Sequence, residues 1–92
     1  FKSRIADNLI ESLLKYATLL DEHEAFDTKL LISDIIFRFD SVNEAALRLK
    51  CATYVFMRKQ YMAKTTYEHF CREYKSLYDE PFEHSFNSII SQ

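Results

Sequence analysis

The stretch "NEAALRLKCATYVFMRKQYMAKTTYEHFCREYKSLYDEP", from Asn43 to Pro81, decides the fold. Its second half carries apolar side chains at alternating intervals of four and three residues, the spacing of one helical face: Ala63, Tyr67, Phe70, Tyr74 and Leu77. Pro81 ends this pattern because it lacks an N–H and restricts the residue before it. An aromatic stripe with this period is typical of a core face, so the sequence predicts that the stripe is buried.

The first half of the stretch predicts another helix, from Glu44 to Lys59, with Asn43 as its N-cap. Two apolar stripes lie on different sides of this helix: Leu47, Cys51 and Tyr54 on one, and Ala45, Leu49, Ala52 and Phe56 on the other. A helix that is apolar on two sides packs between neighbours. We therefore expect it to be the central helix of the domain.

Two helices are predicted before this stretch, from Ser3 to Asp21 and from Asp27 to Phe39. The apolar face of the first consists of Ile5, Leu9, Leu13, Tyr16 and Leu20. The second segment is rich enough in Ile and Phe to form a buried strand, but its length and its spacing favour a helix. After Pro81, the segment from Phe82 to Ile90 predicts a short helix that covers the end of the last hairpin.

Composition points to one soluble helical domain, spanning residues 1–92. The chain contains no glycine and one proline, which fits helices joined by short, ordinary turns and excludes glycine-rich phosphate loops. No apolar run reaches the roughly 20 residues that span a bilayer. The two cysteines are too few for a disulfide framework, so we expect reduced, buried thiols. Because the chain begins at Phe1, we expect a C-terminal fragment of a larger protein.

Candidate catalytic groups are scattered. His23, His69 and His84 do not stand at metal-ligand spacing from one another or from a cysteine. Cys71 lacks a base, since His69, two residues away on a helix, faces another direction. The sequence therefore predicts no enzyme activity, no metal, no cofactor and no small-molecule ligand.

The charge pattern argues against direct nucleic-acid binding. The formal net charge is −2, whereas nucleic-acid modules usually carry a basic excess. A loose basic side is available on the second hairpin, although glutamates dilute it: Lys50, Arg58, Lys59, Lys64, Arg72 and Lys75.

The segment from Glu44 to Leu77 has the 34-residue period of the tetratricopeptide repeat. Ala63 stands where the second helix of that repeat has a small residue. One period earlier, Lys29 occupies the corresponding position and departs from the pattern. The predicted fold is therefore all-α, with tetratricopeptide-like antiparallel hairpins made of about four helices, plus a short C-terminal capping helix.

The stretch also resembles the bacterial transcriptional activator domain, the tetratricopeptide-like module of SARP-type and related bacterial regulators. The resemblance spans about Leu9 to Phe86 and depends on "DSVNEAALRL" (Asp40–Leu49), on "YEHF" (Tyr67–Phe70) and on the exit "DEP" (Asp79–Pro81), where the family has glycine in place of Asp79. It implies a cytoplasmic, non-catalytic module for protein interaction or oligomerisation in bacterial signalling, with DNA binding in a separate domain. The alternative is a generic tetratricopeptide-type scaffold unrelated to transcription.

The terminal segment predicts where a partner binds. The last helix closes the C-terminal end of the array, whereas nothing comparable covers the first helix, which carries Ile5, Leu9 and Ile10. We expect this helix to contact a second copy or a neighbouring regulator domain. Exposed candidates on the first-helix face of the repeats are Tyr16, Arg48 and Lys50.

Overall fold

The computed structural model describes residues 2–20 and 25–91, and side chains from residue 6 onward. It contains α1 (Lys2–Thr18), α2 (Phe26–Phe39), α3 (Glu44–Phe56), α4 (Gln60–Tyr78) and α5 (Phe86–Ile90), and no strand among the described residues. The predicted all-α class, with four main helices and a short C-terminal helix, is confirmed. None of the described helices combines the length and the apolar character that crossing a bilayer requires.

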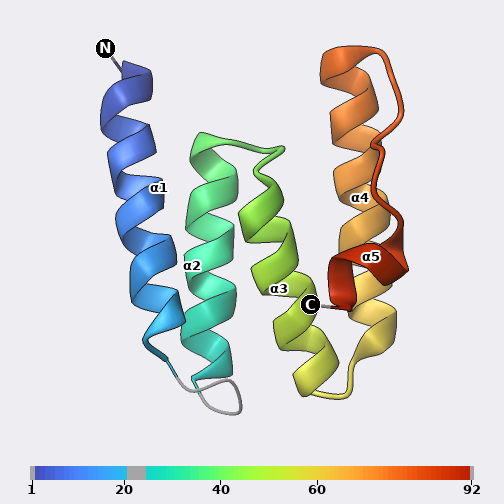
Figure 1. Cartoon of the computed structure of the whole chain (residues 1–92), viewed down its shortest axis with the longest axis horizontal. Coiled ribbons are helices and arrows are strands. Elements are labelled where there is room, and N and C mark those ends of the chain that lie inside the picture. The colour runs from blue at the N-terminus through green and yellow to red at the C-terminus, as the bar shows by residue number, and fades with distance from the viewer. Residues whose placement is uncertain (1, 21–24, 92) are drawn as a thin grey trace.

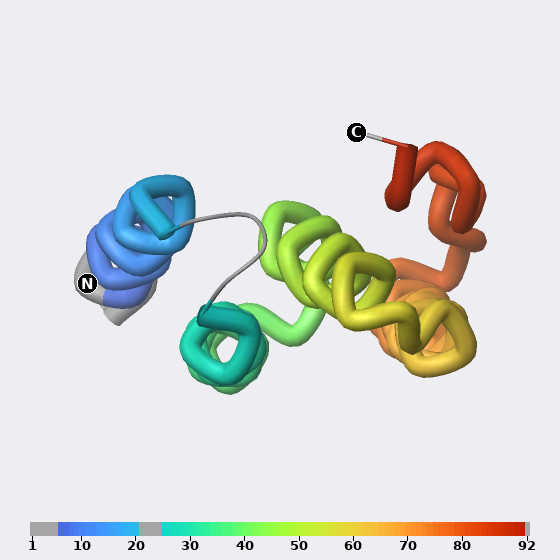
Figure 2. Tube along the Cα trace, turned by 90° about the horizontal axis from the view of Figure 1, so that it is seen from below, coloured from blue at the N-terminus to red at the C-terminus, as the bar shows by residue number. Residues whose placement is uncertain are grey.

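The four main helices stand side by side as antiparallel neighbours (Figure 1). Seen from below, α1, α3 and α5 form one layer, and α2 and α4 form the other (Figure 2). The third helix packs against α2, α4 and α5, while α1 packs against α2. This arrangement confirms that the helix from Glu44 is the central one.

The buried side chains form two clusters. The first joins α1, α2 and α3 through Ile10, Ala17, Ile32, Ile36 and Ala46. The second joins α3, α4 and α5 through Leu47, Cys51, Ala63, Phe70 and Ile89. Tyr54, from the predicted stripe of the central helix, and Tyr67, from the aromatic stripe, both pack against this second cluster. Phe37 is the aromatic residue that packs against both.

Several predicted faces are turned by about one residue. On α3, Ala46 and Thr53 are buried, whereas Ala45 and Phe56 of the predicted second stripe are exposed. A rotation of one residue corresponds to about 100° around a helix. Spacing gives the period of a face, but the neighbouring helix decides which of two adjacent positions points at it.

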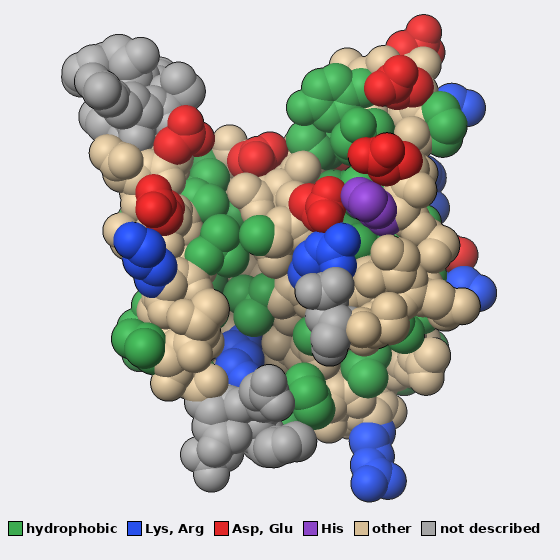
Figure 3. Space-filling view, viewed as in Figure 1, with side chains coloured by type: hydrophobic (Ala, Val, Ile, Leu, Met, Phe, Trp, Pro, Cys, Tyr) green, Lys and Arg blue, Asp and Glu red, His purple; other side chains and the backbone are tan. Residues whose placement is uncertain are grey.

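Leu77 was predicted in the core but is 58% exposed. The cause is the length of α4, which has 19 residues against 13 in α3. Its last turn projects past the central helix (Figure 1), and hydrophobic side chains stand at that corner in Figure 3. On α2, Leu31 and Phe39 are also exposed because neighbours cover only part of its circumference.

The turns are less ordinary than predicted. Among the described residues, three adopt left-handed conformations although none is a glycine: Ala25 (φ 58°), Arg58 (φ 62°) and Asp79 (φ 56°). At Arg58 the backbone N–H donates to the Val55 carbonyl (3.0 Å) and the Lys59 N–H to the Tyr54 carbonyl (2.8 Å). This pair of bonds is the Schellman motif. It ends α3 before the predicted boundary.

Local capping follows the prediction more closely. The Asn43 side chain accepts a hydrogen bond from the Ala46 N–H at 2.9 Å and so caps α3. Asp79 stands in the left-handed position after α4, where the resembled family has glycine, and its N–H donates to the Lys75 carbonyl at 2.8 Å. The terminal helix begins at Phe86, with Ser85 as its N-cap.

Lys29, which departs from the small residue of the repeat pattern, is buried despite its charge. Its ammonium lies 6.0 Å from the centroid of the Phe26 ring.

Candidate interaction surfaces

The first helix presents part of its predicted interface to solvent. Leu9 and Tyr16 (52%) are exposed, and so is Leu19 (82%), which follows the end of α1 and was not predicted. Ile10, also predicted for this interface, is 7% exposed because its side chain packs in the first core cluster. The side chain of Ile5 lies outside the described residues.

The exposed apolar side chains of the first hairpin continue onto its second helix. Leu31 and Phe39 of α2 are both more than half exposed. The spacing of this segment predicts a helix but does not say which of its apolar side chains a neighbour covers. Together with Leu9 and Tyr16 of α1, Leu31 and Phe39 give the first hairpin, α1 with α2, a set of uncovered large apolar side chains.

The opposite end of the array is covered, as predicted. Phe82, Phe86, Ile89 and Ile90 pack against the second core cluster. The ring of Phe86 lies 5.7 Å from that of Tyr67, and the Tyr67 hydroxyl donates a hydrogen bond to the His84 carbonyl. The C-terminal segment therefore contacts α4 through both aromatic packing and a hydrogen bond.

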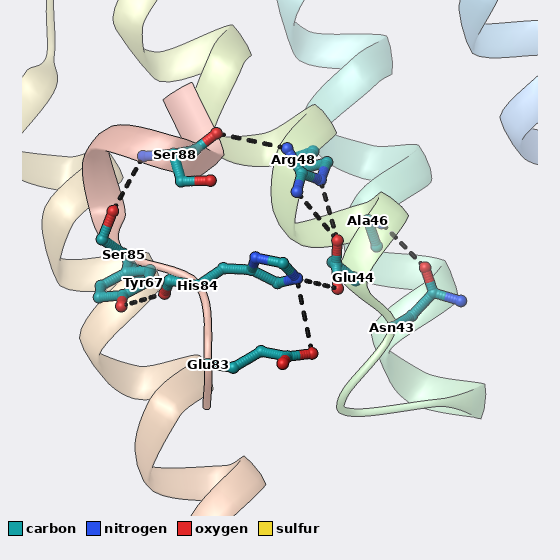
Figure 4. A network of polar contacts seen from close by, with 9 residues as sticks. All are labelled: Asn43, Glu44, Ala46, Arg48, Tyr67, Glu83, His84, Ser85 and Ser88. Atoms are coloured by element: carbon teal, nitrogen blue, oxygen red, sulfur yellow. Dashed lines mark hydrogen bonds and ion pairs between the residues drawn. The ribbon is translucent and has the colours of Figure 1, made fainter. Parts of the chain in front are cut away.

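A polar network joins this terminal segment to the central helix (Figure 4). Arg48 donates to Glu44 Oε2 at 3.0 Å and to the Ser88 carbonyl at 3.4 Å. His84 Nε2 lies 3.6 Å from Glu44 Oε1 and 3.8 Å from Glu83 Oε1. Arg48 was predicted to be an exposed contact residue, but its half-buried guanidinium links α3 to α5 within the chain.

A cavity of about 380 Å³ lies between α2 and α4. One wall comes from α2 and the turn after it, with Asp34, Phe37 and Ser41, and Lys50 reaches in from α3. The other wall comes from α4, with Thr65, Thr66, His69, Phe70 and Glu73. The sequence analysis missed this cavity because its walls belong to helices that are not neighbours in the chain.

Lys50 was predicted to face a partner, but it is engaged inside this cavity. Its ammonium lies 2.8 Å from Asp34 Oδ1 and 6.0 Å from the centroid of the Phe37 ring. The Phe37 and Phe70 rings lie 6.4 Å apart and are tilted by 58°. Glu73 is half-buried and makes no hydrogen bond or ion pair with any residue that the structure describes.

Both cysteines are free, but only Cys51 is fully buried, whereas Cys71 is half-buried. The Cys51 thiol donates to the Ala63 carbonyl, with Sγ and the oxygen 3.4 Å apart. Burial raises the pKa of the Cys51 thiol to about 12, against a smaller opposing effect of the Lys50 charge. Burial also raises the pKa of Tyr67 to about 12. A hydrogen bond with the Cys71 side chain and the charge of Cys71 contribute in the same direction.

Within the described parts of the chain, no three His, Cys, Asp or Glu side chains converge in a way that could hold a metal ion. Comparison with known proteins found no family model, no curated protein and no solved structure that matches this sequence. What is established for the chain is a small all-α domain of five helices in its described residues.

Proposed function

We propose that this chain is a non-catalytic protein-interaction module that self-associates through the outer side of its first hairpin. The observation that carries the proposal is the asymmetry between the two ends of the array. The C-terminal end is covered by α5 and the aromatic side chains around it, whereas Tyr16 of α1 and Leu19, which follows α1, lie largely in solvent. Helical-repeat arrays need a covered apolar face at both ends.

A second copy of the chain suits this surface because α1 is self-complementary in charge. Glu11 and Lys15 form an exposed ion pair at 3.5 Å. Acidic and basic side chains follow one another along α1 in Figure 3. Two α1 helices paired antiparallel along their outer sides, with the two-fold axis midway between positions 11 and 15, bring Glu11 of one copy opposite Lys15 of the other. Two-fold dimers are the commonest oligomers, and such an interface uses the same patch twice.

The resemblance to the bacterial transcriptional activator domain supports placing this module in a cytoplasmic bacterial regulator whose DNA-binding domain is separate. The net charge of −2 also supports DNA binding by a separate domain and not by this chain. A tetratricopeptide-type scaffold unrelated to transcription has the same architecture, and fold alone favours neither. Titration with duplex DNA at about 150 mM salt, where weak electrostatic contacts are screened, should show no binding by this chain.

Sedimentation velocity over a range of protein concentrations tests self-association. We expect a dimer for the natural sequence and a monomer for a variant with Tyr16→Asp and Leu19→Asp. The matched control is Tyr61→Asp, which changes an exposed tyrosine on α4 and should leave the dimer intact. A monomeric natural chain, or equal dissociation of the control, would contradict self-association. A monomer that binds a separate regulator domain through Tyr16 would identify that domain as the partner instead.

A further inference from the structure

We propose that the cavity between α2 and α4 binds an aliphatic cation, either a lysine or arginine side chain of a polypeptide or a free polyamine. The residues that line this cavity do not belong to α1. The proposal therefore does not depend on self-association. The inference begins with the cation that the protein already holds there. The Lys50 ammonium sits 2.8 Å from Asp34 Oδ1 and over the Phe37 ring, so the cavity has the chemistry to hold an alkylammonium group.

The cavity has a second anionic position. Glu73 on α4 is half-buried and has no hydrogen-bond or ion-pair partner in the described chain. The lining carries two carboxylates, those of Asp34 and Glu73, against one ammonium, that of Lys50. Since Asp34 is neutralised by Lys50, Glu73 is the group that would meet an incoming cation.

The hydroxyl groups of the α4 wall also present acceptors. Thr65 donates its hydroxyl proton to the Tyr61 carbonyl at 2.9 Å, and Thr66 donates to the Met62 carbonyl at 2.8 Å. Because each hydroxyl has one proton and two lone pairs, both oxygens can still accept but not donate. Such a wall favours a ligand rich in N–H donors, which describes an ammonium or a guanidinium.

The apolar part of the cavity suits the stem of such a ligand. Phe37 and Phe70, with ring centroids 6.4 Å apart, lie on opposite walls. Methylene groups of lysine and arginine pack on apolar surface while the charged head stays at polar groups, and aromatic faces attract the cation. A volume of about 380 Å³ lies at the lower end of the range for ligand pockets. This size fits one side chain or a short polyamine.

The test is an NMR titration of the isotope-labelled chain with Nα-acetyl-lysine amide, Nα-acetyl-arginine amide and spermidine. We expect the amide signals of α2 and α4 around the cavity to shift. Nα-acetyl-norleucine amide, which has an aliphatic stem without the charge, should leave them unchanged. Tighter binding of the amino-acid amides identifies a polypeptide as the source, and tighter binding of spermidine identifies a free polyamine.

Two variants locate the site. Glu73→Gln should weaken binding by about fivefold, the size expected for one ion pair at a partly exposed position, whereas Glu68→Gln on the exposed side of α4 should not. Lys50→Met should strengthen binding because it frees the Asp34 carboxylate, a gain that a folding defect would not produce. Equal shifts with the norleucine compound would overturn the proposal, as would equal affinity of the two glutamine variants or no gain in Lys50→Met.

Discussion

The ring of Phe82 meets that of Phe70 edge-on, with the two centroids 4.8 Å apart. Phe70 is on α4, and Phe82 follows the proline that ends the helical pattern, so this contact folds the chain back onto α4. Edge-to-face pairs add about 0.5–1.5 kcal/mol beyond the burial of area. The segment after Pro81 therefore contributes to the core and is not a loose tail.

Truncation of Phe70 should bring the domain close to unfolding. The side chain is almost fully buried, and we expect Phe70→Ala to lower the free energy of unfolding by about 3–5 kcal/mol, out of about 5–15 kcal/mol for a domain of this kind. Urea denaturation followed by circular dichroism measures the change. The control is Leu77→Ala on the same helix, which should change stability by no more than about 0.5 kcal/mol. Equal effects of the two substitutions would show that the buried face of α4 has been misassigned.

Replacing Arg58 with glycine should stabilise the protein. Its φ of 62° costs a residue with a Cβ roughly 1–2 kcal/mol, whereas glycine adopts this conformation freely but loses about 0.5–1 kcal/mol in chain entropy. We expect these two contributions to raise the free energy of unfolding by a net of about 0.5–1 kcal/mol, as urea denaturation can measure. Met57→Gly, one residue earlier and in a right-handed conformation, should destabilise the protein. A loss of stability in Arg58→Gly would refute the left-handed assignment.

The two thiols should react at different rates. Cys51 is fully buried and Cys71 is half-buried, so a thiol reagent should modify Cys71 first. Cys51 should react slowly in the native protein and rapidly in denaturant, as mass spectrometry of the labelled chain can follow. Rapid modification of Cys51 without denaturant would contradict its burial. The Cys51→Ala variant assigns the slow phase.

Stability should fall at alkaline pH. The pKa of Cys51 is raised from 9.0 to about 12 in the folded protein by burial. Above pH 9 the unfolded thiol therefore loses its proton while the folded thiol keeps it, and the unfolded state gains free energy of ionisation. The free energy of unfolding should thus decline as pH rises from about 9 towards 12. Tyr67 acts in the same direction over the upper part of this range. Cys51→Ala should show a shallower decline, and an unchanged slope would count against the raised pKa.

The elements that local chemistry determines could be predicted from the sequence. The cap at Asn43, the helix stop before Pro81 and the packing of Tyr67 and Phe70 each depend on residues a few positions apart. The rotation of α1 could not be predicted, because Leu9 and Ile10 are adjacent apolar residues and only the position of α2 decides that Ile10 is buried.

The cavity could not be predicted from the sequence, for a different reason. Asp34 and Glu73 belong to α2 and α4, which come together only because α3 packs against both. Lys50 was predicted to be exposed because it is a charged residue on a helix. No local feature of the sequence indicates that its ammonium pairs with the Asp34 carboxylate. Opposite charges on two helices that share a neighbour are the one sequence feature that could have suggested the pair.

Phe37 packs against both core clusters, and this shared contact bears on how the domain comes apart. Terminal units of a repeat array can open separately, and this ring adds to the coupling that α3 provides by packing against both α2 and α4. Because the same ring supports both, loss of either cluster weakens the other, so the two hairpins should unfold as one cooperative unit. Native-state hydrogen exchange should then give the slowest amides of α2 and α4 the same free energy of opening. In Phe37→Ala those values should separate, and the first hairpin should exchange ahead of the second.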